Sequence, residues 1–327
     1  MSTTHYNAQT TADEVARDCQ SSIAHKTILI TGVSPGGLGA EFAKVIAAYS
    51  PSLIILATRD IRKAQETETE IKRIASPSVA TRVLELDLSS QAQIRSAAKE
   101  VLAYEEHIDV LVNNAGVMAP PFMLFDDGVE SQFAINHVGH FLFTNLIMSK
   151  LVAPGRTGRV VNVSSNGHQL GPVRFHDWNF DEGRNYDTWL AYGQAKTANM
   201  LFSVSLAEKL GDRGLVSVSV HPGTINTNLM RGDWDESFKS LVQWFKTLGY
   251  FRAGSSEFAW KSIAQGVATH VFAAFHDSVS SSENNGLYLQ DCTVLKPEEV
   301  RSWARDPIEA EQLWRLTEDI VGERFDY

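Results

Sequence analysis

The stretch TGVSPGGLG, residues 31–39, contains four glycines and one proline within nine residues. An apolar run at residues 27–30 precedes it, and a helical pattern follows at residues 40–46. A strand, a glycine loop and a helix in this order can hold the phosphates of a dinucleotide, because backbone N–H groups and the positive end of the helix face the anion. The spacing is not the usual G-x-G-x-x-G, and a purely structural glycine turn is the alternative.

Outward from this loop, short apolar runs alternate with helical patterns. The runs are rich in β-branched residues and do not alternate with polar ones, which is typical of strands buried on both faces. The expected strands are 28–30, 53–57, 81–86, 109–113, 159–164, 215–220 and 287–290, and the expected helices are 39–49, 60–75, 89–104, one within 126–151, and 188–211. This order predicts an α/β fold with a Rossmann-type, doubly wound parallel sheet. We expect one domain, residues 25–327, after a mobile N-terminal arm, residues 1–24.

Composition narrows the class of partner. The 327 residues carry a formal net charge of −10, whereas nucleic acids and anionic membranes require a basic face. No apolar run approaches the ~18 residues of a membrane span, and the polar N-terminus does not resemble a signal peptide. The two cysteines, Cys19 and Cys292, lack the spacing of a metal site. We therefore expect a soluble cytoplasmic protein with no metal, nucleic-acid or membrane partner.

One segment, about residues 224–285, interrupts the alternation after His221-Pro222-Gly223. It leaves from the carboxyl end of a predicted strand, where ligands bind in open α/β sheets. We predict that it covers a bound substrate as a helical lid; the alternative is ordinary helices packed on the edge of the sheet. Its aromatic residues are Trp234, Phe238, Trp244, Phe245, Tyr250, Phe251, Phe258 and Trp260.

The end of the second predicted strand bears on the choice of dinucleotide. An NAD site normally has Asp or Glu about 20 residues after the glycine loop, whereas an arginine suits the 2′-phosphate of NADP. Here the strand ends in Ala57 and Thr58, followed by Arg59. The pattern favours NADP(H), with Arg59 forked onto the phosphate. In the alternative interpretation Arg59 is solvated and Asp60 caps the next helix.

Four further motifs follow the loop in order: Asn113-Asn114-Ala115-Gly116, Asn136, Ser164-Ser165, and Tyr192-x-x-x-Lys196. With the loop, they resemble the classical short-chain dehydrogenase/reductase family over residues 26–227. The segments 135–141 and 221–227 are similar to the retinol-dehydrogenase-related branch. That branch often has a membrane anchor, and we expect none here, so its retinoid chemistry is not carried over.

The glycine loop departs from the family pattern, T-G-x-x-x-G-x-G, by one extra residue. Aligned from the helix, Gly37 and Gly39 keep their places. The extra residue bulges before them, with Pro35 limiting its freedom and Gly36 permitting unusual dihedral angles. We expect dinucleotide binding to survive this insertion.

Tyr192 and Lys196 are four residues apart on a predicted helix and therefore share a face. Carbonyl reduction needs a proton on oxygen, and a nearby ammonium lowers the pKa of a phenol, ordinarily about 10. The resemblance implies the same roles: Tyr192 is the acid/base, Lys196 tunes it and binds the ribose, Ser165 donates to the substrate oxygen, and Asn136 holds a water that links Lys196 to solvent.

Each role has a structural alternative. Tyr192 could be a buried aromatic, Asn136 a plain helix residue, and Ser164 the donor in place of Ser165. The histidines at 137, 140, 168 and 176 lack a metal-ligand pattern; we expect the first two to be packing residues and His168 to line the pocket.

By position, the resemblance also implies a set of cofactor contacts. These are Gly32, Ser34, Gly37, Leu38 and Gly39 at the pyrophosphate; Arg59 at the 2′-phosphate; Asp87 and Leu88 at the adenine; Asn113 and Gly116 at the ribose, with Tyr192 and Lys196; and Pro222, Gly223, Thr224 and Thr227 at the carboxamide and diphosphate.

The sequence predicts an NADPH-dependent reductase of a small, lipophilic ketone or aldehyde. An NAD-dependent alcohol oxidase is one alternative, and a non-catalytic NADP-binding sensor or scaffold is another. Members of this family often dimerise through the tyrosine helix, so a homodimer is possible.

Overall fold

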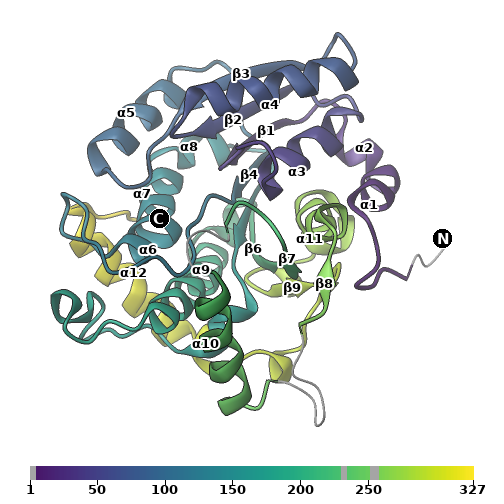
Figure 1. Ribbon diagram of the computed structural model, residues 1–327. Helices are drawn as coiled ribbons and strands as arrows, with labels where there is room; N and C mark the ends of the chain where they lie inside the picture. The colour runs from purple at the N-terminus through teal and green to yellow at the C-terminus, as the bar shows by residue number, and fades with distance from the viewer. Residues whose placement is uncertain (1–4, 230–233, 251–257) are drawn as a thin grey trace.

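The computed structural model describes residues 5–229, 234–250 and 258–327, with residues 234–236 described by their backbone alone (Figure 1). Its main sheet has eight strands in the order β10-β9-β6-β5-β4-β1-β2-β3, all parallel except β10. Their bounds are β1 Thr27–Thr31, β2 Leu53–Thr58, β3 Ala80–Glu85, β4 Val110–Asn113, β5 Gly158–Val163, β6 Leu215–His221, β9 Tyr288–Gln290 and β10 Thr293–Val294. A separate parallel pair joins β7 Thr224–Ile225 to β8 Trp260–Lys261.

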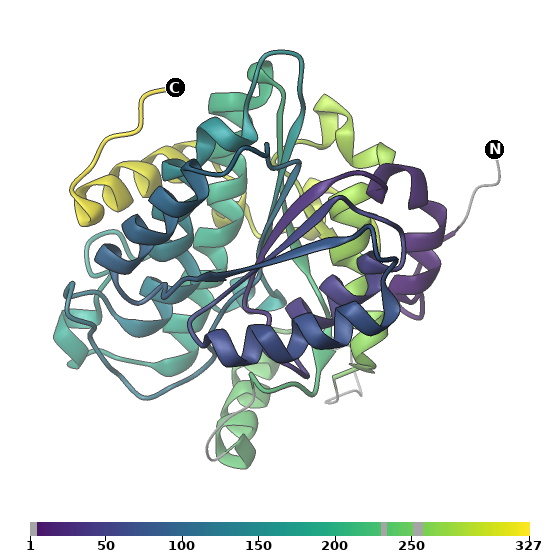
Figure 2. The same ribbon diagram turned by 90° about the horizontal axis from the view of Figure 1, so that it is seen from above.

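Helices cover both faces of the sheet, as Figure 2 shows from above. One layer packs with the inner strands into a core that contains residues of α1 Ala12–Asp18, α2 Gln20–Ile23, α3 Leu38–Ala47, α4 Ile61–Ile74 and α11 Ile263–Phe275. The other core contains residues of α5 Gln91–Leu102, α6 Ser131–Phe133, α7 Gly139–Leu146, α8 Met148–Leu151, α9 Thr188–Leu210 and α12 Pro307–Val321. The predicted α/β fold with its doubly wound sheet is thereby confirmed.

Shorter helical turns connect these elements. One is a π-helical turn, η1 Ala134–Val138, between α6 and α7. The others are 3₁₀ turns: η2 Asn166–Leu170, η3 Phe180–Gly183, η4 Gly211–Arg213, η5 Asp277–Ser280, η6 Ser282–Asn284, η7 Pro297–Glu299 and η8 Ser302–Ala304.

The central strands form because their side chains are buried on both faces. Every residue of β1, β2 and β6 is buried. β3, at the edge of the sheet, has exposed and partly exposed positions along most of its length. Parallel alignment brings the carboxyl ends of β1, β4, β5 and β6 to one edge of the sheet, where the glycine loop also lies.

The N-terminal region differs from the mobile arm that the sequence predicts. α1 begins after Thr11, whose backbone N–H donates to Glu14 Oε2 at 2.7 Å in a capping box. Ala12, Val15 and Ala16 are fully buried and belong to the same core as α11. Their i, i+3, i+4 spacing is that of an amphipathic helix, and the polar residues between them obscured it.

The segment at residues 224–285 is two different structures rather than one lid. α11 is buried along most of its length in the core beneath the sheet, as the alternative interpretation expected. α10 Trp234–Thr247 instead packs on Leu170, Trp189 and Tyr192 through Leu241 and Phe245. Residues 230–233 and 251–257 of the predicted lid lie outside the described residues.

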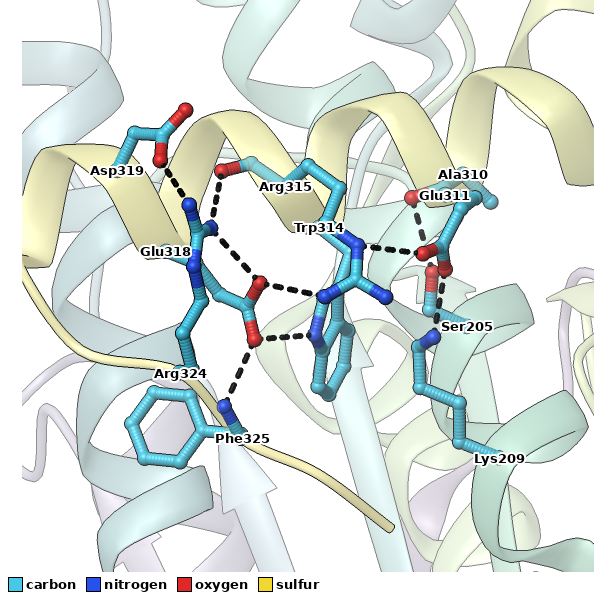
Figure 3. Close-up of polar contacts among 10 residues, drawn as sticks. All are labelled: Ser205, Lys209, Ala310, Glu311, Trp314, Arg315, Glu318, Asp319, Arg324 and Phe325. Atoms are coloured by element: carbon cyan, nitrogen blue, oxygen red, sulfur yellow. Dashed lines mark hydrogen bonds and ion pairs between the residues drawn. The ribbon is translucent and has the colours of Figure 1, made fainter.

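The C-terminal helix α12 is anchored by a buried carboxylate (Figure 3). Glu318, whose side chain is fully buried, accepts from Trp314 Nε1 at 3.0 Å and from the backbone N–H of Phe325 at 2.7 Å. Arg315 and Arg324 each donate to its other oxygen at 3.0 Å. The carboxylate thus ties the C-terminal tail to α12.

We expect Glu318→Ala to lower the free energy of unfolding by about 2–4 kcal/mol, because it leaves the buried N–H groups of Trp314 and Phe325 without acceptors. Urea unfolding measures this loss. Glu311→Ala is the matched control: its carboxylate pairs with Lys209 and Arg315 while 43% exposed, and such pairs contribute about 1 kcal/mol or less. Equal losses in the two variants would contradict the anchoring role of Glu318.

Candidate functional site

A cavity of about 880 Å³ opens at the carboxyl ends of the central strands. It runs from the glycine loop, past the ends of β2 and β5, to the face of α10. Most residues that the sequence predicts for the site line this cavity. They are Gly32, Ser34, Gly37, Leu38, Arg59, Asp87, Leu88, Gly116, Ser165, Tyr192, Lys196, Pro222, Gly223, Thr224 and Thr227.

The glycine loop is shaped for close approach of a ligand. Gly32 has φ of +77°, and a Cβ there would lie 2.7 Å from the Cα of Ala115, so glycine lets the end of β1 pack against the residues that follow β4. Gly37 forms the N-cap of α3, which directs the helix's first N–H groups at the cavity. The extra residue causes a turn with Gly36 at φ of +75°. Pro35 O in that turn accepts from Asn228 Nδ2 at 2.8 Å.

Three predicted site residues do not line the cavity. A Cβ on Gly39 would lie 2.6 Å from both Gly32 O and Asn114 Nδ2, so this glycine permits packing of α3 on the loop. Asn113 lies below the cavity, where its Nδ2 donates to Thr144 at 3.0 Å and to Asn162 at 2.9 Å. Its neighbour Asn114 lines the cavity instead. Successive strand residues face opposite ways, and the motif does not reveal which asparagine points outward.

Asn136, the third of these residues, contacts the backbone of the cavity wall rather than the cavity itself. Its side chain pairs with both backbone groups of Val117, accepting at 2.9 Å and donating at 3.0 Å. It is fully buried within the π-helical turn η1. Its carbonyl accepts from Nδ1 of His140 at 3.1 Å, and His140 Nε2 lies 2.9 Å from Thr31 Oγ1. Asn136 therefore fixes the wall at residues 116–117 rather than facing the cavity.

Two cations line the end of the cavity beyond β2. Arg59 lies there as predicted, and Lys63, one turn along α4, lines it as well. Asp60 caps α4 by accepting from Arg62 N at 3.1 Å, so capping and a lining Arg59 occur together. Lys63 lies in the first turn of α4, and a basic residue just after Arg59 at the start of a predicted helix was the signal that could have identified it.

Tyr192, Lys196 and Ser165 meet at the centre of the cavity. Lys196 Nζ lies 5.6 Å from the centroid of the Tyr192 ring and donates to Val163 O at 3.0 Å. Ser165 lines the cavity beside Tyr192, and its hydroxyl acts to lower the pKa of the phenol. Ser164 Oγ instead donates to Lys196 O at 2.7 Å, so its hydroxyl is already engaged.

The protonation of this pair differs from the sequence expectation. Burial raises the pKa of Tyr192 to about 12, and the hydrogen bond from Ser165 offsets only part of that rise. Burial lowers the pKa of Lys196 to about 8. Burial and the Ser165 hydroxyl, rather than the ammonium of Lys196, set the pKa of the phenol. At neutral pH the tyrosine is a protonated phenol that can donate.

Apolar residues form the far end of the cavity. The wall at Met118, Ala119, Pro120 and Pro121 faces Trp189 on α9. Ala119 has φ of +53°, and its N–H donates to Gln132 Oε1 at 3.0 Å. α10 and the segments that flank it complete this end with Phe238, Leu241, Phe245, Tyr250 and Phe258.

Some predicted lining residues lie elsewhere. Trp244 is half-buried in the cluster behind Phe245 and does not line the cavity, and the side chain of Trp234 is outside the described residues. His168 is buried beside Tyr288 rather than in the cavity wall, whereas His221 lines the cavity. Among the described residues no three His, Cys, Asp or Glu side chains gather as a metal site would require.

The family model of the short chain dehydrogenases matches residues 26–177 of this chain. A chloroplastic short-chain dehydrogenase TIC 32 A from Brassica napus is 36% identical over 97% of this chain and 94% of its own length. The chain belongs to the short-chain dehydrogenase/reductase family. Human retinol dehydrogenase 11 is 35% identical over 91% of this chain and 86% of its own, which places this short-chain dehydrogenase/reductase in the retinol-dehydrogenase-related branch.

The solved structures agree with this assignment. An uncharacterized protein from Mycobacterium paratuberculosis superposes on this short-chain dehydrogenase/reductase with a TM-score of 0.70 and 30% identity, over 93% of this chain and 96% of that one. The chain is therefore an oxidoreductase of a family that binds NAD(P). No helix in the part of the chain that the structure describes has the length and apolarity for crossing a membrane.

The residues present fit a nicotinamide dinucleotide. The loop residues that line the cavity and the start of α3, with Gly37 as its N-cap, suit its pyrophosphate. When bound, the dinucleotide supplies or accepts a hydride. Ser165 and Tyr192 line the cavity together, so their hydroxyls could hold a substrate oxygen and move one proton there, while the apolar wall could exclude water.

Proposed function

We propose that this protein is an NADPH-dependent reductase of bulky, uncharged, lipophilic ketones or aldehydes. The observation that carries the proposal is that Ser165, Tyr192 and Lys196 line one cavity, with the Lys196 ammonium 5.6 Å from the centroid of the Tyr192 ring. A phenol in this position can donate a proton to a carbonyl oxygen that gains hydride. The same groups would serve alcohol oxidation in reverse, so the assay below separates the two directions.

The shape of the cavity supports the substrate class. Among the described residues, its far end carries aromatic and aliphatic side chains and no charged ones, as an uncharged apolar substrate requires. Against a non-catalytic sensor, Ser165, Tyr192 and Lys196 are all present and converge on one point. We also propose a cytoplasmic location, as the composition suggests.

A panel of ketones, aldehydes and alcohols, followed by the absorbance of the reduced cofactor with both dinucleotides, tests the proposal. We expect reduction of bulky carbonyls with NADPH at a higher kcat/KM than with NADH. A preference for alcohols with NAD⁺ would support the oxidase. Cofactor binding without turnover of any compound would support the sensor.

Cofactor choice should depend on Arg59. We expect Arg59→Asp to weaken NADPH binding by about 100-fold or more relative to NADH, because a charge-assisted contact to the 2′-phosphate becomes repulsion. Isothermal titration with both dinucleotides measures this. Lys63→Ala is the matched control. It should weaken NADPH binding by a smaller factor than Arg59→Asp and leave NADH binding unchanged, since it removes one cation without adding an anion. Equal losses of both dinucleotides with Arg59→Asp would show that Arg59 does not read the phosphate.

We also propose a homodimer, and the position of α12 restricts which surface of α9 could form its interface. Ser205 Oγ on the tyrosine helix α9 donates to Ala310 O at 3.0 Å, and Leu206 and Leu210 share a core with Leu313 and Trp314 of α12. Part of α9 is therefore already covered within the chain. We propose that any homodimer contacts a surface other than this one.

A further inference from the structure

Asn166, the residue after the catalytic serine, is held from three directions. Its backbone N–H donates to His221 Nδ1 at 3.3 Å. Its side-chain Nδ2 donates to the hydroxyl of Tyr250 at 2.8 Å, and its Oδ1 accepts from the hydroxyl of Tyr288 at 3.1 Å. The three partners come from the end of β6, from the residues after α10, and from β9. Asn166 thus joins the sheet to the helix that covers the substrate end.

Tyr250 is firmly attached to α10. Its backbone N–H donates to Phe245 O at 2.9 Å, and the centroids of the two rings are 4.5 Å apart. Phe245 is buried in the cluster that contains Tyr192 and Trp189. A movement of α10 away from the cavity would therefore carry the Tyr250 hydroxyl away from Asn166.

Asn166 also determines where Ser165 points. It is the first residue of the turn η2, and Ser165 is the N-cap, whose Oγ accepts from Gly167 N at 3.0 Å. Ser165 O accepts from Nδ1 of His168 at 2.9 Å in the same turn. A rotation of this turn would displace the serine hydroxyl from Tyr192. The side-chain contacts of Asn166 oppose such a rotation.

We propose that Asn166 is a positioning residue that aligns Ser165 when α10 is closed, with the Tyr250 hydroxyl as the latch between them. The inference deepens the proposed reductase function and rests on it. Closure over the substrate and assembly of the proton-donating pair are then one event. Such coupling keeps the pair unassembled until the substrate is enclosed.

The test combines Tyr250→Phe, Asn166→Ala and the double variant, assayed on the best carbonyl of the panel. Tyr250→Phe keeps the ring and removes the hydroxyl. We expect kcat to fall about 5- to 30-fold, as expected for loss of one buried hydrogen bond, with the Kd for NADPH within about two-fold of the original. Adding Tyr250→Phe to Asn166→Ala should lower kcat little further, because Asn166→Ala already removes the contact with Tyr250. Additive losses, or a normal kcat in Tyr250→Phe, would overturn the inference.

Tyr288→Phe is the matched control, because it removes the other side-chain bond of Asn166 without touching α10. Amide hydrogen exchange distinguishes the Tyr250→Phe protein from the Tyr288→Phe protein, and it does not depend on turnover. We expect Tyr250→Phe to speed exchange in both α10 and η2, and Tyr288→Phe to speed it in η2 alone. If hydrogen exchange in α10 is unchanged in the Tyr250→Phe protein, the proposal that the Tyr250 hydroxyl is a latch is wrong. If the original protein reduces no carbonyl while these exchange changes occur, the proposed function fails and the latch stands.

Discussion

Tyr192→Phe should lower kcat by about 10³-fold or more and leave the affinity for NADPH within about two-fold. The substitution removes the proton that the buried phenol donates and keeps the ring that packs at 6.1 Å from Trp189. General acid catalysis by a positioned group typically contributes 10²–10⁴-fold. Because the proton is needed only in the transition state, the loss should appear in kcat and kcat/KM rather than in cofactor binding. Single-turnover mixing with a carbonyl, alongside fluorescence titration of NADPH, measures both quantities.

Lys196→Ala serves as the contrasting variant. Its ammonium lies beside the tyrosine ring and lines the same cavity, so we expect it to impair both turnover and NADPH binding. Substantial turnover of any carbonyl by the Tyr192→Phe protein would refute the acid assignment. A loss confined to NADPH affinity would instead assign Tyr192 to cofactor binding.

The sheet and the spacing of the tyrosine and lysine could be predicted because both depend on local periodicity. Strands buried on both faces leave continuous apolar runs such as residues 53–57. Residues four apart on a helix must share a face, and this places Tyr192 and Lys196 together in the same cavity. Parallel strands bring their carboxyl ends to one edge, which is why the ends of β1, β2, β4 and β5 could be expected to surround one ligand.

Features that depend on orientation or on long-range contacts could not be predicted in this way. Which of Asn113 and Asn114 faces the cavity depends on the exact end of β4, and a shift of one residue reverses it. The pKa of Tyr192 depends on burial by α10 and the sheet rather than on its neighbour four residues away. The partners of Asn166 lie 55, 84 and 122 residues away, so no local pattern contains them.

Acid should destabilise this protein steeply below pH 6.5. Burial holds the pKa of five of its histidines far below the usual 6.5: about 3 for His137 and His221, and about 4 for His140, His168 and His270. Above pH 6.5 these side chains are largely neutral in both the folded and the unfolded protein. As the pH falls below 6.5, the unfolded chain binds a proton at each of them while the folded protein does not until pH 3–4. Stability therefore decreases as the pH falls.

The size of this effect follows from the proton linkage. Each such histidine costs on the order of 1 kcal/mol between pH 7.5 and pH 5.5. Five together amount to several kcal/mol, against the ~5–15 kcal/mol of a typical domain. Urea unfolding at pH 7.5, 6.5 and 6.0 should show the midpoint falling through this range, before global acid unfolding sets in.

A single substitution tests whether the buried histidines cause the loss of stability at low pH. His270 lies on α11 in the core, 6.5 Å from the ring of Phe42. His270→Leu keeps a side chain of similar size and removes one group that cannot be protonated in the folded protein. We expect it to reduce the loss between pH 7.5 and 6.0 by about one fifth, whatever it does to stability at pH 7.5. A flat stability between pH 7.5 and 6.0, or a loss in His270→Leu equal to that of the original protein, would show that burial does not keep these histidines neutral.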